Sequence, residues 1–558
     1  MRHESSIWLI LRKLRTPLIV LNLAHAIPVL LLTLVPGADG EGNPIHLSFF
    51  DAMYVVAYTA TTIGFGEVPY AFTYPQRIIL LITIYAAVPA WLYALGSIIA
   101  LFQDKAFIHA IRMNTFRRKV RNLKQDFIII CGYTDAGRLL INKLNEDNLF
   151  RIIVIDKNAD KIEALKSELY MPSIPAVVAD ASSTDVLKSA GVLSMHCKYL
   201  ITLFDDDQTN LKISVRARIL NKNLKIIARS GLKQGGENLT NIGVNHVIDI
   251  FLIIARRIDF ALKSPYLFNL YSWMQGGNLH VSKTDILPSG KYIVCSGGRF
   301  GKTLKKTLDK NHMDYIFLDV NKKINEKVSS DQEFFLEAGI MNASCIIAGT
   351  NDDAINLSIV ATARALKPDI FVIVRENELE ERSLFSHLRA DKIFMIDQIA
   401  ALDAYNYIDR PMTYDFIDTI SFFEKEKLID TLQHITNRVN KRPDLLELAV
   451  NPNTMYALCD FLTHTPVTLG QIINNPYHNG IDLEIAVLGI KRKDGKFILM
   501  PEDKTPLQLN DHLLIATIQP SLKSFMTIVN HHHELYYVLH GVEEKTIYIP
   551  FTKRKIAV

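Results

Sequence analysis

Two long uncharged apolar runs set the first hundred residues apart from the rest of the chain. Residues 17–35 and 78–102 carry no formal charge, and at about 1.5 Å of rise per residue a helix of either length crosses the roughly 30 Å hydrocarbon layer of a membrane. Basic residues flank the outer ends of both runs, whereas the loop between them carries acidic residues. This asymmetry predicts two membrane-spanning helices with both termini on the cytoplasmic side.

A third apolar stretch, residues 48–60, lies between the two runs and is too short to cross a membrane. We predict a re-entrant pore helix here, because backbone at membrane depth must be buried in protein or line a wet cavity. The stretch leads into YTATTIGFGEVPY at residues 58–70. The carbonyl end of a helix offers partial negative charge to a cation, and a glycine-rich segment can turn successive carbonyls to one side. The pattern predicts backbone oxygens that replace the water shell of a cation.

From residue 125 onward, short apolar runs alternate with amphipathic stretches, which is typical of a parallel α/β sheet. The pattern occurs twice, because residues 203–230 and 349–376 align at a constant offset of 146 residues. The second copy is shorter ahead of this block. We expect it to have lost or remodelled the third strand, which residues 177–179 form in the first copy.

Each copy carries most of a dinucleotide-binding pattern, in which glycines let a pyrophosphate approach a helix N-terminus and an acid accepts the ribose hydroxyls. Neither copy has an intact G-x-G-x-x-G. The acids Asp156 and Asp319 favour unphosphorylated ribose, hence NAD or an adenine nucleotide such as ADP over NADP. The candidate nucleotide-binding residues are Gly132, Thr134, Asp135, Gly137, Asp156 and Asp180 in the first copy, and Gly297, Gly298, Arg299, Gly301, Asp319 and Arg375 in the second. The alternative for either copy is a fold kept only as a scaffold.

Charge and cysteine content indicate which partners and which cellular compartment suit the chain. The chain has 62 basic and 58 acidic residues, and its net charge of +4 is too small to argue for nucleic acid. Its five cysteines form no C-x-x-C pair, which fits a reduced compartment. Asp205, Asp206 and Asp207 carry the oxygen ligands that Ca2+ or another divalent cation prefers, but three acids also suit a helix start. The histidines at 531–533 predict a solvated turn rather than a metal site.

The motif between the two spans resembles the selectivity filter of potassium channels, whose usual form is T-V-G-Y-G. The matching residues are Thr62, Ile63, Gly64, Phe65 and Gly66. The resemblance implies that their backbone carbonyls bind K+, and that four copies surround the pore as a homotetramer in the cell (inner) membrane. Phe65 lacks the hydroxyl with which tyrosine braces many such filters, and the predicted pore helix contains no tryptophan. What supports the outer end of the filter therefore stays open.

The way in which the pore opens is also inferred in part from the resemblance to potassium channels. Neither span carries the row of arginines that a voltage sensor needs, so we expect a ligand to open the pore. In similar channels the inner helix bends near a glycine about 20 residues past the filter. This chain has none at that distance, and Pro89 and Gly96 are the candidates for the bend.

Tandem Rossmann-like units behind a two-span pore resemble the RCK (regulator of K+ conductance) domains of ligand-gated potassium channels, those of the GsuK type included. In that family, eight such domains from four chains form a cytosolic ring that pulls on the inner helices. The implied fold is a membrane α-helical pore domain with two transmembrane helices and a re-entrant pore helix, followed by two α/β Rossmann-like RCK domains and a small C-terminal α+β subdomain.

The resemblance also implies domain boundaries and a function. The ranges are 1–106 for the pore domain, 107–124 for a linker whose basic face suits lipid headgroups, 125–290 for the first RCK domain with its helical crossover, 291–405 for the second Rossmann lobe, 406–466 for its crossover and 467–558 for the C-terminal subdomain. The implied function is a K+-selective channel gated by a nucleotide, with no enzymatic activity. Two alternatives stay open: a regulatory subunit of a cation transporter, and a membrane-anchored nucleotide-dependent oxidoreductase.

Overall fold

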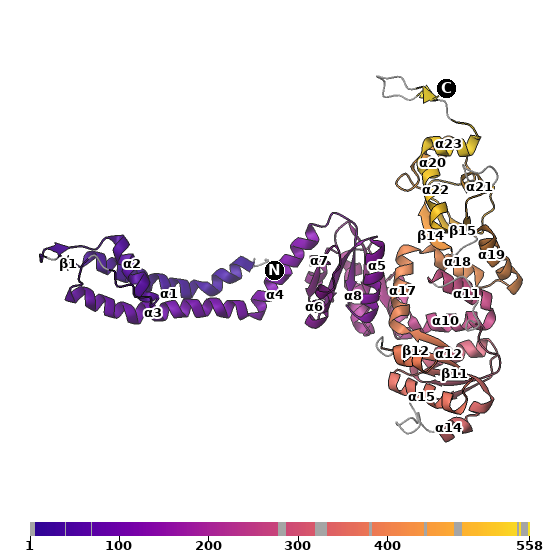
Figure 1. The fold of residues 1–558 in the computed structure, drawn as a ribbon, viewed down its shortest axis with the longest axis horizontal. Helices are drawn as coiled ribbons and strands as arrows, with labels where there is room; N and C mark the ends of the chain where they lie inside the picture. The colour runs from indigo at the N-terminus through magenta and orange to yellow at the C-terminus, as the bar shows by residue number, and fades with distance from the viewer. Residues whose placement is uncertain are drawn as a thin grey trace. The chain divides into compact units, whose positions relative to one another are not determined.

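The computed structural model divides into two compact units. The first comprises Met1–Leu123 with Ser189–Gly191, and the second comprises Lys124–Lys188 with Val192–Val558. The first unit is almost entirely helical, and the second contains the larger sheets (Figure 1). The structure describes residues 6–39, 41–67, 70–276, 286–318, 332–378, 382–439, 443–473, 482–543, 546–547 and 556–557.

The first unit contains two long apolar helices with a short helix between them. Its elements are α1 (Ser6–Leu34), β1 (Gly37–Ala38), β2 (Pro44–Ile45), α2 (Phe49–Ala60), α3 (Tyr74–Gln103) and α4 (Lys105–Arg121). Lys13–Leu34 and Tyr74–Gln103 are long and apolar enough to cross a membrane. Helix α1 packs along α3. The buried side chains of α3 include Ala87, Ala90 and Ala94, and small residues of this kind allow close helix approach in membranes.

Capping residues explain where these helices begin. Ser48 precedes α2, and its hydroxyl accepts a hydrogen bond from the N–H of Asp51 at 3.1 Å. Thr73 and Gln76 form a capping box at the start of α3, which therefore begins four residues before the apolar run at 78. Asp104 caps α4, so much of the segment expected as a linker is a helix.

The first Rossmann lobe has a six-stranded parallel sheet. Its strands are β3 (Phe127–Cys131), β4 (Arg151–Asp156), β5 (Ala176–Val178), β6 (Cys197–Thr202), β7 (Lys225–Arg229) and β8 (His246–Ile248), in the order β5-β4-β3-β6-β7-β8. Its helices are α5 (Asp135–Asp147), α6 (Ala159–Ser167), α7 (Thr184–Ser189), α8 (Asp207–Leu220) and α9 (Lys233–Asn241). The central strand β3 is buried along its whole length, as expected for a sheet covered on both faces.

The second Rossmann lobe repeats this topology with five strands in the described residues. They are β9 (Lys291–Ser296), β10 (Tyr315–Leu318), β11 (Ala343–Gly349), β12 (Phe371–Glu376) and β13 (Lys392–Met395), in the order β10-β9-β11-β12-β13. Its helices are α12 (Gly298–Lys310), α14 (Gln332–Glu337), α15 (Asp353–Leu366) and α16 (Arg382–His387), with a 3-10 turn at Ile340–Asn342. Within the described part of this lobe, no strand corresponds to β5, in line with the shorter second copy.

The two lobes exchange their crossover helices. The first lobe continues into α10 (Ile250–Lys263) and α11 (Pro265–Met274), and α10 packs on α12 of the second lobe. The second lobe continues into α17 (Ile396–Asp409), α18 (Met412–Ile420) and α19 (Lys425–Arg438), and α17 packs on α5 of the first lobe. One hydrophobic core therefore includes residues of both sheets, such as Ile128 and Tyr292.

The C-terminal region is α+β, as predicted. Strands β14 (Asp444–Ala449), β15 (Ile485–Lys491), β16 (Phe497–Leu499) and β17 (His512–Thr517) form an antiparallel sheet in the order β14-β17-β15-β16. Helices α20 (Tyr456–Leu462), α21 (Leu469–Ile473), α22 (Gln519–Asn530) and α23 (His532–His540) accompany it, and β18 (Thr546–Ile547) pairs with β19 (Ile556–Ala557). The expected boundary at 467 is too late, because β14 already belongs to this sheet. Its partner β17 lies far along the sequence, where a local pattern does not indicate the pairing.

Candidate functional site

Residues 62–66, the predicted filter and here called the filter strand, leave the C-terminus of α2 with their first three N–H groups turned toward that helix. The N–H of Thr62 donates to the carbonyl of Thr59 at 3.1 Å, and the next two N–H groups donate to the carbonyl of Tyr58 at 3.1 and 3.3 Å. The φ angle is +62° at Thr62, +61° at Gly64 and +73° at Gly66, and it is not positive at the residues between them. Such alternation turns successive peptide groups to one side. The carbonyl oxygens opposite these three N–H groups, those of Thr61, Thr62 and Ile63, therefore face away from the carbonyl groups of α2 that accept the bonds.

Aromatic side chains of α2 hold the outer end of the filter strand. The ring of Phe65 stacks on Tyr54 with a centroid distance of 6.4 Å and meets Tyr58 edge-on at 6.5 Å. The hydroxyl of Tyr54 donates to the carboxylate of Glu67 at 3.1 Å. Tyr54 thus provides the hydroxyl that Phe65 lacks. Sequence reasoning missed this support, although two tyrosines four residues apart on one helix face were a readable signal.

One chain leaves the side chains of the filter strand largely uncovered. Ile63 and Phe65 are 61% and 63% exposed, and a Cβ added at Gly64 would have no neighbour within 4 Å among the described residues. Gly64 is therefore required for its left-handed backbone rather than for lack of space. Farther along, α3 is continuous through Pro89 and Gly96, so the position of the bend stays a prediction.

The glycine loop of the first lobe is tight and tied to the sheet. Gly132 has a φ of +103°, and a Cβ at Gly137 would collide with the carbonyl oxygen of Gly132. Thr134 caps α5: its hydroxyl accepts from the N–H of Gly137 and donates to the carbonyl of Leu203, both at 3.2 Å. The threonine that replaces the middle glycine therefore anchors this loop to the end of β6.

The acids of the first cleft already have partners or lie at its surface. Asp156 is 2% exposed, and its carboxylate accepts from the backbone N–H groups of Tyr133 and Asn158, each at 2.8 Å. Asp135 is exposed in the first turn of α5. Burial raises the pKa of Asp180 and hydrogen bonds from Ser182 lower it, with a net downward shift.

The second cleft places an arginine next to its glycine loop. Gly297 precedes α12, Gly298 has a φ of +60°, and Arg299 follows in the first helical turn. A Cβ at Gly301 would lie 2.7 Å from the ring of Phe317, so this glycine allows close packing of helix and strand. Arg299 Nη2 pairs with a carboxylate oxygen of Asp249. The predicted ribose acid, Asp319, lies outside the described residues.

Arg375 reaches the same region from the end of β12. Its guanidinium lies 5.0 Å from the ring centroid of Phe251 and 5.7 Å from that of Phe300. Burial lowers the pKa of Arg375 to about 10; the charge of Asp353 opposes this shift, and that of Arg229 adds to it. The structure therefore brings together two of the predicted residues of the second cleft, Arg299 and Arg375.

The three consecutive aspartates do not form one site. Asp205 pairs with Arg229 at 2.8 Å, Asp206 caps α8, and Asp207 accepts from the hydroxyl of Ser230 at 2.9 Å. Within the described residues, no group of three His, Cys, Asp or Glu side chains could hold a metal ion. The structure therefore does not support the candidate divalent site at these aspartates, because helix capping and ion pairing direct the three carboxylates to different partners.

The histidines near the C-terminus do not all lie in the solvated turn that the sequence predicted. His531 lies between α22 and α23, whereas His532 and His533 begin α23. His532 lies 3.8 Å from the carboxylate of Asp460 and meets the ring of Tyr456 edge-on.

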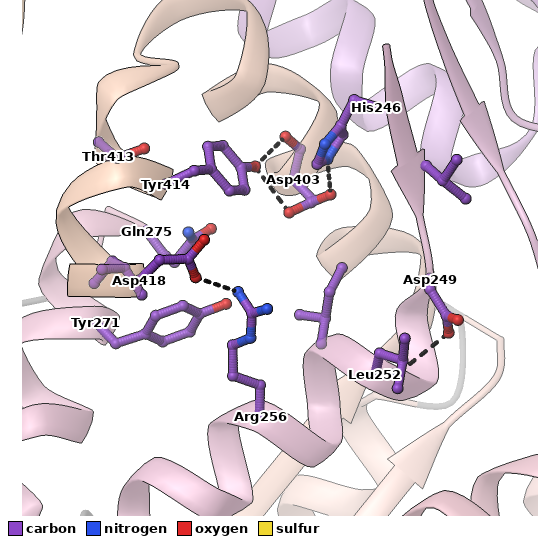
Figure 2. A pocket seen from close by; sticks show the side chains of 13 residues that line it. His246, Asp249, Leu252, Arg256, Tyr271, Gln275, Asp403, Thr413, Tyr414 and Asp418 are labelled. Atoms are coloured by element: carbon purple, nitrogen blue, oxygen red, sulfur yellow. Dashed lines mark hydrogen bonds and ion pairs between the residues drawn. The ribbon is translucent and has the colours of Figure 1, made fainter. Parts of the chain in front are cut away.

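A cavity of about 230 Å³ lies between α10, α11 and the helices that follow the second lobe (Figure 2). His246 Nε2 and Asp403 Oδ2 are 2.6 Å apart, and the hydroxyl of Tyr414 donates to Asp403 Oδ1 at 2.8 Å. Across the cavity, Arg256 pairs with Asp418 at 3.3 Å. Burial raises the pKa of Tyr414 well above its usual value. The sequence did not indicate this network, because His246 and Asp403 are 157 residues apart.

Comparison with known protein families finds matches to two kinds of domain in the chain. A model of the ion channel family matches residues 18–104, and a model of the TrkA-N domain matches residues 128–250 and 292–396. The chain joins an ion-channel domain to two TrkA-N domains. This confirms the resemblance to potassium channels with tandem RCK domains and the predicted fold class.

Similar proteins include several archaeal sequences. An uncharacterized protein of Methanothermus fervidus is 28% identical over 248 residues, which are 44% of this chain and 37% of that protein. Potassium channel protein 1 of Methanocaldococcus jannaschii is 27% identical over 242 residues, 43% of this chain and 68% of that protein. The chain therefore spans little more than a third of the first relative and about two thirds of the second.

Solved structures that match this chain include the GsuK channel, with 17% identity, coverage of 93% of this chain and 98% of that chain, and a TM-score of 0.46. The GsuK channel bound to NAD has 17% identity, coverage of 94% and 99%, and a TM-score of 0.43. GsuK has also been solved bound to ADP, with 20% identity, coverage of 73% and 100%, and a TM-score of 0.43.

Proposed function

We propose that four copies of this chain form a K+-selective channel in the cell membrane, which a cytosolic nucleotide opens or closes. The channel domain forms the pore, and the Rossmann lobes with both chain termini lie on the cytoplasmic side. The ligand is NAD or an adenine nucleotide such as ADP. No enzymatic reaction is part of this proposal, and neither is a divalent cation at Asp205, Asp206 and Asp207.

The geometry of the filter strand is the single observation that carries the proposal. Positive φ angles at Thr62, Gly64 and Gly66, with intervening residues of the other hand, support a row of carbonyl oxygens on one side. Rings of carbonyl oxygens replace the hydration shell of K+ in selective pores. A membrane-anchored oxidoreductase or a regulatory subunit would have no use for this backbone between its anchors.

The shape of an oxygen cage and the exposure of the filter side chains support the tetramer. One strand supplies one side of an oxygen cage, so a ring around the ion needs copies related by rotation. Ile63 and Phe65 are more than half exposed in one chain, and neighbouring copies would cover them. Pro89 and Gly96 are the positions at which we propose that α3 bends when the pore opens.

The second Rossmann cleft fits a nucleotide better than the first. Its Gly297–Gly298 loop leads into the N-terminus of α12, where backbone N–H groups and the helix dipole attract phosphate. Arg299 and Arg375 add positive charge there. In the first cleft, Asp135 occupies the first helical turn and Asp156 is committed to backbone N–H groups. The residues present would hold phosphate in the second cleft.

Modest binding energies suffice for gating. Moving a closed-to-open equilibrium from 1:99 to 99:1 needs about 5.5 kcal/mol of differential ligand binding. Shared among four equivalent chains this is roughly 1.4 kcal/mol each, which lies within the ordinary range of allosteric coupling.

Flux from liposomes tests the proposal. Purified chain is reconstituted at low density, and K+ and Na+ efflux are measured with and without millimolar ADP or NAD, alongside the mass of the detergent complex. We expect a tetramer, K+ efflux well above Na+ efflux, and a change in K+ efflux with at least one nucleotide. A monomer, or equal leakage of both ions, contradicts the channel; K+ flux that ignores both nucleotides contradicts the gating ligand alone.

A further inference from the structure

The exchanged helix α10 brings a carboxylate of the first lobe to the glycine loop of the second. Asp249 precedes α10 and accepts a hydrogen bond from the N–H of Leu252 at 3.2 Å, so it is the N-cap of this helix (Figure 2). Its other oxygen pairs with Arg299 Nη2, in the first turn of α12. Asp249 and Arg299 come from different lobes, and their side chains are only 12% and 16% exposed. The ion pair is therefore largely shielded from water.

The guanidinium of Arg299 has capacity for a second anionic partner. Its Nη1 is buried and finds no acceptor among the described residues. The same guanidinium lies over the ring of Phe251, 5.7 Å from the centroid, and Phe251 follows Asp249 in α10. A buried N–H without an acceptor is costly, so an additional anion at this point would be stabilised.

Arg375 adds a second positive charge to the same ring. It lies 5.0 Å from the centroid of Phe251, and its Nε also lacks an acceptor in the described part of the chain. Two guanidinium groups thus flank Phe251, and the ion pair with Asp249 neutralises one of them. Asp353, the acid that acts on Arg375 electrostatically, already accepts N–H bonds from Asn377 and Glu378.

The corresponding region of the first cleft has the opposite balance of charge. Arg229, the counterpart of Arg375 in the duplication, pairs with both Asp205 at 2.8 Å and Asp397 at 2.9 Å. Asp397 lies in the first turn of α17, the exchanged helix of the second lobe. Asp135 also acts electrostatically on Asp397. Arg229 therefore pairs with two carboxylates, which leaves this arginine without excess positive charge for a phosphate.

We propose that Asp249 acts as an internal counter-anion in the second cleft, and that the phosphate of a bound nucleotide displaces it from Arg299. This inference rests on the proposed nucleotide regulation and assigns the phosphate to the second copy. Asp249 also caps α10, which packs on α12, so its release changes the contact between the two lobes. Anion exchange at one arginine thus couples ligand binding to the lobe arrangement, as coupling between a site and a two-state contact requires.

Asp249→Asn is a sharp test of this inference. Asparagine is as good a helix N-cap as aspartate, so α10 keeps its start while the charge that competes for Arg299 is lost. A charge-assisted hydrogen bond contributes enough for about a tenfold change in a binding constant. We therefore expect the full-length D249N tetramer to bind ADP about tenfold more tightly than the unaltered chain in calorimetric titration.

Two further variants complete the test. Arg299→Gln removes the shared partner, so ADP binding weakens at least tenfold and D249N then adds no gain in the double variant. Asp418→Asn is the matched control: it breaks an ion pair between α10 and α18, that of Asp418 with Arg256, without touching Arg299. Its ADP affinity stays within about twofold of the unaltered chain.

The outcomes separate this inference from the proposed function. Unchanged ADP affinity in D249N, with K+ flux and its nucleotide response intact, overturns the counter-anion role and leaves the channel standing. An equal gain of ADP affinity in D418N overturns the counter-anion role as well, because a general loosening of α10 would then explain the gain in both variants. ADP binding by D249N but not by the unaltered chain supports it. Absence of ADP binding in both overturns the counter-anion role. It overturns nucleotide gating only if the K+ flux also ignores NAD, and the K+ selectivity of the flux still reports on the channel.

Discussion

Replacing Gly64 by alanine perturbs the backbone that the proposed function depends on. Gly64 has a φ of +61°, and an added Cβ meets no atom within 4 Å in one chain. The cost is therefore conformational rather than steric, on the order of 1–2 kcal/mol per residue held in the left-handed region. In a conducting pore all four copies must hold this conformation at once. The penalties sum to roughly 4–8 kcal/mol, which lowers the population of the conducting filter by about a thousandfold or more.

The assay is K+ efflux from liposomes at equal protein density. We expect G64A to lose K+ efflux while the tetramer and ADP binding persist, because the Rossmann lobes are unchanged. Gly42→Ala is the matched control. Gly42 also has a positive φ, +85°, with no atom within 4 Å of an added Cβ, but it lies outside the filter strand. Undiminished flux in G64A, or an equal loss in G42A, would refute the assignment of residues 62–66 as the conducting backbone.

Three further predictions concern the second unit. Gly137→Ala lowers the thermal midpoint of the purified chain, because its Cβ collides with the carbonyl of Gly132 and forces the loop to shift at a cost of about 1–3 kcal/mol. Tyr414→Phe costs about 1–3 kcal/mol in denaturant unfolding, because the buried Asp403 loses a donor at 2.8 Å. The five cysteines are buried, so maleimide labels them only after unfolding; burial alone raises the pKa of Cys295 to about 12.

Each of these three predictions has its own control variant or contradicting result. Gly231→Ala should leave the midpoint unchanged, since its φ is not positive and its added Cβ would lie 3.7 Å from the nearest side-chain atom, an ordinary contact. Tyr407→Phe should cost less than Tyr414→Phe, because the hydroxyl of Tyr407 makes an exposed hydrogen bond of 3.3 Å. Rapid labelling of native chain at neutral pH would contradict the burial of the thiols.

Local patterns predicted most of the elements but not their full length. The short helix was expected at 48–60 and is Phe49–Ala60, because Ser48 is its cap. The apolar runs at 17–35 and 78–102 miss the beginnings of α1 (Ser6–Leu34) and α3 (Tyr74–Gln103), since hydropathy reports the part that suits lipid while caps decide where a helix starts. The parallel order of the strands followed from the alternation of strands and helices.

The partners of the candidate residues could not be predicted in this way. Asp156 ends β4 as expected, but its bonds to backbone N–H groups depend on the fold of a loop 23 residues earlier. Arg229 and Asp397 are 168 residues apart and come from different lobes. No local period indicates such pairs, because they arise from the exchange of α10 and α17. The aspartates at 205–207 show the opposite error, because residues that are adjacent in sequence were expected to share one site. Their carboxylates instead bind three separate partners.

The duplication explains why one motif need not have one role. Both copies keep a glycine loop, a helix behind it and an arginine at the end of the corresponding strand, so the shared residues preserve the fold. Each cleft receives one acid from the other lobe. Asp397 pairs with Arg229, which also pairs with Asp205 of its own lobe. Asp249 pairs with Arg299, while Arg375 lies near the same ring of Phe251 and is acted on electrostatically by Asp353. On the proposed counter-anion role, we expect a phosphate to prefer the second cleft, although each glycine loop by itself suits phosphate. The acid that the exchanged helix brings to each cleft would then decide which copy binds the ligand.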